Sequence, residues 1–104
     1  MADEQPKTNV QMRIDESKTR VTYANAFRHH ATPQELILDF GINVVTPTKQ
    51  PKDGEPGEAQ MNFQIDNRLV MNYLTAKRLA GTLVQLVQAH EKRFGEIKLD
   101  QQQG

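Results

Sequence analysis

Residues 35–45 read ELILDFGINVV, and this stretch decides the fold. Its even-numbered positions are all large and apolar: Leu36, Leu38, Phe40, Ile42 and Val44. Successive residues of a strand point to opposite faces of a sheet, so strict alternation predicts a strand with one apolar face. The other face carries Glu35 and Asp39, which lie four residues apart, and we expect both to be solvated. Residues 35–45 are therefore the predicted central strand.

Three further segments show the same alternation. They are residues 10–14 with Val10, Met12 and Ile14, residues 20–28 with Val21, Tyr23 and Phe27, and residues 61–71 with Met61, Phe63, Ile65, Leu69 and Met71. The first is short and predicts an edge strand. The last is interrupted by polar Asn67, which predicts a bulge near Asp66 and Asn67. Residues 29–34 contain Pro33 and are expected to connect two strands.

A helical period replaces the alternation after Asn72, which is a suitable N-cap residue. The helix is expected to run from Tyr73 to Phe94 and to end at Gly95, over a length of about 33 Å. Its apolar face spans an arc of about 160° and contains Ala76, Leu79, Ala80, Leu83, Val84, Leu86, Val87, His90 and Phe94.

These elements predict an α+β fold, with an antiparallel sheet of three to four strands followed by one long C-terminal helix packed on it. Residues 9–98 form the single predicted domain, between disordered tails at 1–8 and 99–104. Residues 46–59 include three Pro and two Gly between positions 47 and 57 and are expected to form a flexible loop.

The apolar helix face is wider than one small sheet can cover. We expect Leu79, Leu83, Leu86 and Phe94 to face the sheet and Ala80, Val84 and Val87 to form an oligomer interface with another copy. A homodimer or a higher oligomer is therefore the predicted assembly.

Charge and composition exclude several classes of function. Thirteen basic residues balance thirteen acidic ones, so no global field attracts nucleic acid or an anionic membrane, and the chain has no cysteine for a disulfide or a thiolate metal site. The chain also lacks an apolar signal region and an apolar run of 18 residues, which predicts a cytoplasmic protein with no membrane contact. A local basic patch of Lys77, Arg78, Lys92 and Arg93 keeps nucleic-acid binding open as an alternative.

No catalytic, cofactor-binding or metal-binding constellation is present in the sequence. Glycine-rich phosphate loops, Gly-x-Ser-x-Gly and His-Glu-x-x-His are all absent. His29 and His30 are adjacent, and neighbours on an extended chain point to opposite faces, so they do not chelate one ion together. We expect the protein not to be an enzyme and to bind no cofactor.

Four segments carry a resemblance to a known family. They are Thr22-Tyr23-Ala24-Asn25, residues 33–40 (PQELILDF), Ala76-Lys77-Arg78-Leu79 and Phe94-Gly95-Glu96-Ile97. With these segments the chain resembles the bacterial and archaeal family called domain of unknown function 3467, over about residues 9–98. The family commonly has Met-Pro where this chain has Val45-Thr46-Pro47, and Thr-Pro where it has Asn72-Tyr73. The resemblance implies no catalytic or binding residues, because the family has no established activity.

The order of elements is also similar, more loosely, to the export chaperone SecB, whose subunit has four strands before a long helix. Together these observations predict a non-catalytic homo-oligomeric protein-interaction or structural module. An accessory nucleic-acid-binding protein and a SecB-like chaperone that binds unfolded polypeptide stay open as alternatives.

Overall fold

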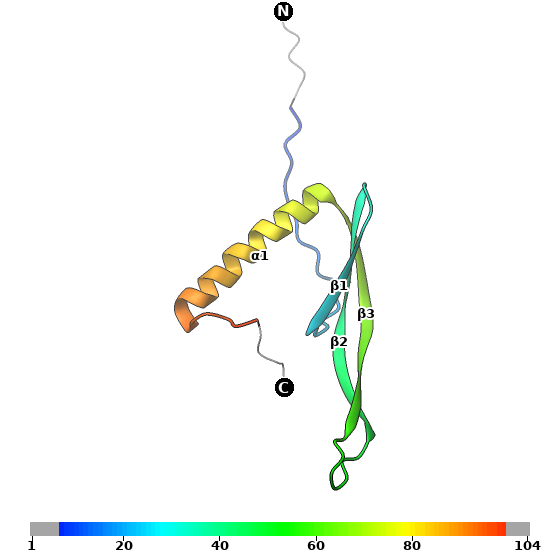
Figure 1. Ribbon diagram of the computed structural model, residues 1–104. Helices are drawn as coiled ribbons and strands as arrows, with labels where there is room; N and C mark the ends of the chain where they lie inside the picture. Colours follow the sequence, from blue (N-terminus) through cyan, green and yellow to red (C-terminus); the bar gives the residue numbers. More distant parts are fainter. Residues whose placement is uncertain (1–6, 100–104) are drawn as a thin grey trace, which may run out of the picture.

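The computed structural model describes residues 7–99, and in this range the chain forms one antiparallel sheet followed by one helix (Figure 1). The strands are β1 (Ala26–Ala31), β2 (Glu35–Lys49) and β3 (Glu58–Asn72), and the helix is α1 (Tyr73–Phe94). The sheet order is β1-β2-β3, so β2 is central. The predicted α+β fold with an antiparallel sheet and a C-terminal helix is confirmed. The predicted tails lie mostly outside the described residues.

Strands β2 and β3 form a hairpin that is longer than the sequence predicts. Pairing continues through Pro47↔Ala59 to Lys49↔Glu58, so the expected 46–59 loop shortens to residues 50–57. A bridge between Lys52 and Glu55 closes this loop. A proline is tolerated at a sheet edge where the N–H group that it lacks would point outwards. Pro47 is at such an edge, because β1 does not extend alongside it.

A bulge at Asp66 divides the apolar stripe of β3 between the two faces of the sheet. Phe40 pairs with Asn67 and Gly41 pairs with Ile65, which leaves Asp66 as the additional residue. An extra residue in one strand moves every side chain beyond it to the opposite face of the sheet. The sequence predicted this bulge but not its consequence. Leu69 and Met71 lie on one face of the sheet, and the apolar residues of the stretch 61–65 lie on the other.

Strand β1 begins and ends later than predicted. It includes His29 and His30, which were expected in a connection, and the hairpin turn to β2 is closed by the Thr32 N–H, which donates to the Glu35 carbonyl at 2.9 Å. Of the predicted strand 20–28, the part before residue 26 is not a strand. The Thr32 hydroxyl also accepts from the Glu35 N–H at 3.0 Å, and this four-residue turn sets where β1 starts to pair.

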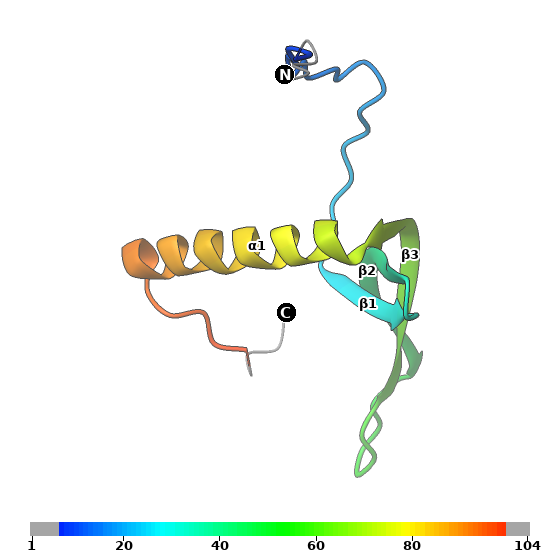
Figure 2. The same cartoon turned by 90° about the horizontal axis from the view of Figure 1, so that it is seen from above.

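The predicted edge strand 10–14 is not formed, since residues 7–16 have no regular secondary structure. Alternation alone does not make a strand, because the backbone groups need a partner strand to bind. In Figures 1 and 2 this part of the chain runs away from the sheet.

Helix α1 has the predicted ends. The Asn72 side-chain oxygen accepts from the Thr75 N–H at 2.8 Å, and Gly95, with a φ of 102°, donates its N–H to the Glu91 carbonyl. Positive φ is a conformation that glycine adopts without strain. The Tyr73 hydroxyl donates to the Thr32 carbonyl at 2.7 Å and fixes the first turn of the helix to the β1–β2 hairpin.

The helix is not packed along the sheet, contrary to the prediction. It contacts β2 and β3 where it begins and then extends away from them (Figures 1 and 2). The physical reason is that β3 ends at Asn72 and α1 begins at Tyr73, so no connecting residues reverse the chain direction. No residue of α1 is buried, and Leu83, Leu86 and Phe94, which were expected to face the sheet, are exposed.

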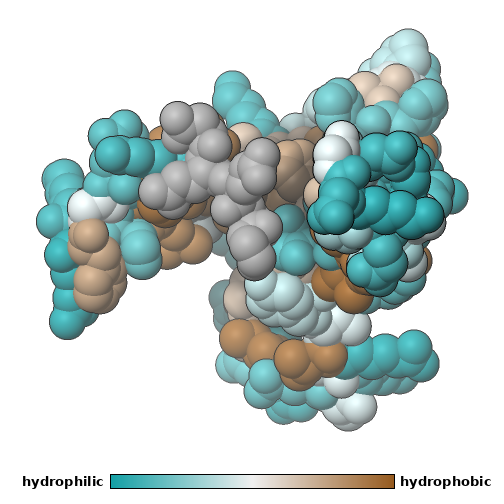
Figure 3. Space-filling view, turned by 60° about the horizontal axis from the view of Figure 1, so that its bottom comes forward, coloured by the Kyte–Doolittle hydropathy of each residue, from teal (hydrophilic) through white to brown (hydrophobic). Residues whose placement is uncertain are grey.

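The single chain consequently has no hydrophobic core among its described residues. Its radius of gyration is 21.9 Å, whereas a compact domain of this length has about 13 Å. Figure 3 shows apolar residues, in brown, reaching the surface at several separate places. Monomeric soluble proteins rarely expose this much apolar surface.

Gly41 provides a test of the bulge. A Cβ atom on Gly41 would overlap the Gln64 carbonyl oxygen and lie 2.9 Å from the Ile65 Cα. We expect Gly41→Ala to lower the free energy of unfolding by about 1–3 kcal/mol or more. The overlapping atoms belong to the backbone and cannot move aside as the end of a flexible side chain can. Urea unfolding followed by circular dichroism at one fixed protein concentration measures the change.

Gly81→Ala is the matched control. Gly81 lies inside α1, and apart from the backbone of its own helix turn and its chain neighbours nothing lies within 4 Å of the added Cβ, so alanine there is expected to stabilise by about 0.5–1 kcal/mol. A Gly41→Ala protein as stable as the unaltered chain would show that the bulge does not require glycine.

Candidate functional site

The one buried polar side chain in residues 7–99 is Asp39, which is only 4% exposed. It lies in the middle of β2, and its direct cross-strand neighbours are Arg28 on β1 and Arg68 on β3. Directly paired residues project from the same face of a sheet. The three strands therefore place one carboxylate between two guanidinium groups.

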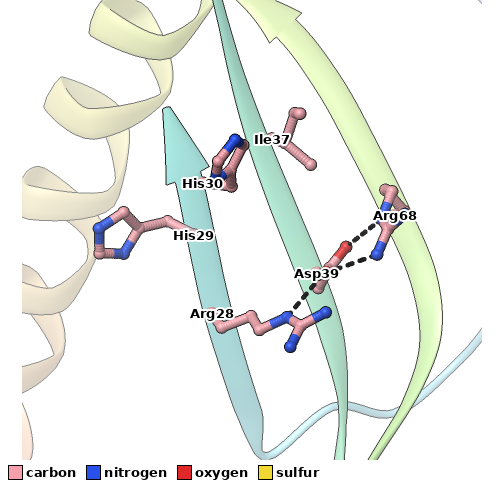
Figure 4. Close-up of a pocket in the computed structure, with 6 residues that line it drawn as sticks. All are labelled: Arg28, His29, His30, Ile37, Asp39 and Arg68. Atoms are coloured by element: carbon pink, nitrogen blue, oxygen red, sulfur yellow. Dashed lines mark hydrogen bonds and ion pairs between the residues drawn. The ribbon is translucent and has the colours of Figure 1, made fainter. Parts of the chain in front are cut away.

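Both carboxylate oxygens of Asp39 accept hydrogen bonds (Figure 4). Arg28 Nε donates to Oδ2 at 2.8 Å, Arg68 Nε donates to Oδ1 at 2.7 Å, and Arg68 Nη2 donates to Oδ2 at 3.2 Å. The contact with Arg68 is thus bidentate, which is the stronger and more directional geometry. The Arg28–Asp39–Arg68 triad links all three strands through side chains.

These contacts hold the pKa of Asp39 well below its usual value. Hydrogen bonds from Arg68 and then from Arg28 lower it from 3.8 to about 2, against the opposing effect of burial. The same carboxylate raises the pKa of Arg68. At neutral pH Asp39 is ionised and its oxygens are already occupied, so it is poorly suited to act as a general base.

The triad borders a hollow of about 420 Å³ that is also lined by His29, His30 and Ile37. In Figure 4 the His29 side chain points away from Asp39. Two arginines and one aspartate leave a formal excess of one positive charge, and both arginine side chains are more than half exposed. Exposed guanidinium N–H groups can donate to an anion, but the six lining residues include no hydroxyl or thiol nucleophile.

The structure keeps the residues of the predicted basic patch apart. Lys77 and Arg78 lie near the start of α1 and Lys92 and Arg93 in its last turn, about 22 Å along the axis. Arg93 lies over the Phe94 ring, 5.2 Å from its centre. The four residues therefore form two separate pairs.

The predicted interface residues Ala80, Val84 and Val87 all lie on the exposed surface of α1. His90 is exposed as well, with its ring 4.8 Å from that of Phe94. Within residues 7–99, no cluster of three or more His, Asp or Glu side chains is arranged to hold a metal ion. No helix in that range is long and apolar enough to cross a membrane.

Sequence reasoning missed the triad because it treated Asp39 as a solvated residue. The available signal was the hairpin register. The turn at Thr32–Glu35 pairs Ala31 with Leu36. Three residues further from the turn in each strand, Arg28 pairs with Asp39. The opposite contact with Arg68 depends on the registration of β3, which a long loop and a bulge obscure in the sequence.

Comparison with known proteins identifies the family. The model of a family described as Protein of unknown function (DUF3467) matches residues 1–99. The chain belongs to the DUF3467 family. No curated protein and no solved structure matches it.

The structure gives physical roles to the first segment that carries the DUF3467 resemblance. Asn25 donates its backbone N–H to the Gly41 carbonyl, and its side-chain oxygen accepts from the Asn43 N–H at 2.8 Å. The Thr22 hydroxyl accepts from Asn67 Nδ2 at 2.9 Å, next to the bulge. This segment therefore ties the chain before β1 to both β2 and β3.

The triad makes the stability of the folded protein depend on pH in the acidic range. The pKa of Asp39 is lower in the folded state, so its stabilising contribution is present above pH 3.8 and is lost as the pH falls towards about 2. We expect Asp39→Asn to lower the melting temperature at pH 7 and to flatten the decline between pH 4 and pH 2. Thermal unfolding at fixed protein concentration over this pH range measures both effects.

Glu35→Gln is the matched control, because it neutralises another β2 carboxylate that forms no ion pair among the described residues. A smaller effect than that of Asp39→Asn is expected at pH 7. Equal melting temperatures for both variants would contradict a stabilising role for the triad.

Proposed function

We propose that this protein is a non-catalytic interaction module that acts as a homo-oligomer, in which copies cover each other's apolar surfaces. One observation carries the proposal: no apolar side chain of residues 7–99 is buried within the single chain. Burial of apolar surface is the main favourable term in folding. This chain therefore needs contact with another apolar surface to gain the free energy of apolar burial.

The exposed area supports assembly quantitatively. The chain exposes 10290 Å², whereas a compact monomer of 11.8 kDa exposes about 5,900 Å². The eleven residues outside 7–99 account for at most about 1,800 Å² of the difference, even if fully extended. More than about 2,500 Å² per chain is left, or about 5,000 Å² for two chains, which is at the upper end of the total area that obligate dimers bury.

The exposed face of α1 is the first candidate contact. Val84 is 54% exposed and Val87 is 44% exposed, and Ala80 lies on the same side of the helix. Full burial of a valine side chain contributes about 1.5–3 kcal/mol. A formal net charge of zero also leaves no general repulsion between copies.

Another copy is favoured over nucleic acid as the partner. The candidate basic residues are divided between the two ends of α1, and Arg28 and Arg68 are paired with Asp39. A nucleic-acid surface requires clustered cations. The cytoplasmic location predicted from the sequence is part of the same proposal, and cell fractionation tests it.

The assembly is tested with Val84→Glu, which puts a charge into the proposed contact. We expect the unaltered chain to have a mass of at least twice 11.8 kDa in light scattering, and Val84→Glu to shift the mass towards that of one chain. The melting temperature of the unaltered protein should also rise with concentration, because association stabilises the folded state.

Gln85→Glu is the control, since it adds the same side chain on the side of α1 opposite the apolar face and should leave the mass unchanged. A mass of 11.8 kDa from micromolar to near-millimolar concentration would contradict the proposal. A melting temperature independent of concentration would contradict it too, and this second measurement applies even if Val84→Glu unfolds.

A further inference from the structure

The outer edge of β3 is an open row of backbone hydrogen-bonding groups. The Thr32 N–H donates to the Glu35 carbonyl and the Asn25 N–H to the Gly41 carbonyl, so odd-numbered residues of β2 direct their backbone groups towards β1. Even-numbered residues of β2 therefore bind β3, where Ile42 pairs with Gln64 and Val44 with Asn62. Between them, residues 61, 63 and 65 direct their N–H and C=O groups outwards, because alternate residues of a strand bind opposite sides.

Between residues 59 and 65, before the bulge at Asp66, this edge has no proline, charged side chain or bulge, the features that usually prevent strand addition. β3 is 15 residues long and contains no proline. By contrast, the open part of the β2 edge contains Pro47, whose odd position directs its ring nitrogen outwards, and the Asn43 N–H is bound by the Asn25 side chain. Long open edges without proline readily accept another strand. The apolar residues Met61, Phe63 and Ile65 lie along this stretch of β3.

A segment of matching character is unpaired elsewhere in the chain. Val10, Met12 and Ile14 alternate with polar residues, and their side chains are 87%, 89% and 83% exposed. Among the described residues, no backbone hydrogen bond reaches residues 9–14. Three apolar residues in five positions correspond to the three apolar residues of β3 between positions 61 and 65.

We infer that residues 9–14 of a second copy pair with the outer edge of β3 at residues 61–65 and add a fourth strand to the sheet. This inference rests on the proposed homo-oligomer and identifies one of its contacts. A second copy is favoured because residues 7–16 run away from their own sheet in both views (Figures 1 and 2). An exchange of identical segments between two copies closes a symmetric dimer at low cost.

The exchange is reciprocal, because each copy carries both segments. The Thr22 hydroxyl is bound by Asn67 of β3, so the N-terminal segment leaves its own sheet beside β3. β3 is also the strand whose outer edge is open. A turn follows towards the N-terminus, in which the Ser17 N–H donates to Asp15 and the Thr19 N–H to the Glu16 carbonyl. Pairing would give the outward backbone groups of β3 hydrogen-bond partners and place Val10, Met12 and Ile14 beside apolar side chains.

Cysteine cross-linking tests the contact, because the natural chain contains no cysteine. Met12 is the middle of its segment and Phe63 the middle of the other, so they are opposite whether the strands run parallel or antiparallel. Cα atoms of directly paired residues are about 4.5–5.5 Å apart, which a disulfide spans. We expect the Met12→Cys, Phe63→Cys double variant, after mild oxidation, to migrate at twice the 11.8 kDa chain mass in a non-reducing gel.

The matched control combines Gln11→Cys with Phe63→Cys, which puts the first thiol on the opposite face of the added strand, and it should not cross-link. Met12→Cys combined with Met61→Cys or with Ile65→Cys covers a register shift of two residues. Each single variant, oxidised alone, should stay at the mass of one chain.

Four outcomes would overturn the inference. Cross-linking without a change of mass would mean that residues 9–14 pair with their own sheet, and cross-linking of Phe63→Cys alone would mean that β3 pairs with β3 of the second copy. Absence of a cross-link in every register, in protein that light scattering shows to be oligomeric, would reject this contact and leave the proposed oligomer standing. A monomer in light scattering would reject both.

Discussion

The direct junction between β3 and α1 is the constraint on which the shape of this protein depends. Asn72 is both the last residue of the strand and the N-cap of the helix. Because no loop separates the two elements, the helix cannot turn back along the sheet, and the Tyr73 hydroxyl bond to Thr32 fixes its direction at the start. The apolar faces of both elements are left open. The absence of a hydrophobic core among residues 7–99 of the single chain follows from this one junction.

A sheet without a core needs other interactions to hold its strands together. The Arg28–Asp39–Arg68 triad supplies a charged link across all three strands, and the Asn25 and Thr22 side chains add hydrogen bonds next to the bulge. Ion pairs in which both carboxylate oxygens are bound are directional, so they favour one register of the strands in addition to stabilising the sheet. The triad therefore aligns the three strands, while burial of the apolar surface is left to the proposed assembly.

Membership of the DUF3467 family places this arrangement in a group whose activity is not established. The features of the chain agree with an interaction role at several levels. Its charges balance, no apolar side chain of residues 7–99 is buried, and the carboxylate of buried Asp39 is bound by two arginines. The open edge of β3 and the unpaired residues 9–14 are the two segments of the chain that the inferred exchange would join.

The sequence by itself determined the elements whose signals are local. Alternation in residues 35–45 and the change of period at Asn72 predicted the central strand and both ends of the helix, because side-chain direction and capping depend on neighbouring residues. Only the tertiary structure decided which residues meet. The bulge at Asp66 moved half of the β3 stripe to the other face, the hairpin register brought Asp39 between two arginines, and the strand-to-helix junction took α1 away from the sheet. Register and direction are properties of pairs of distant segments, and a local pattern carries little information about either.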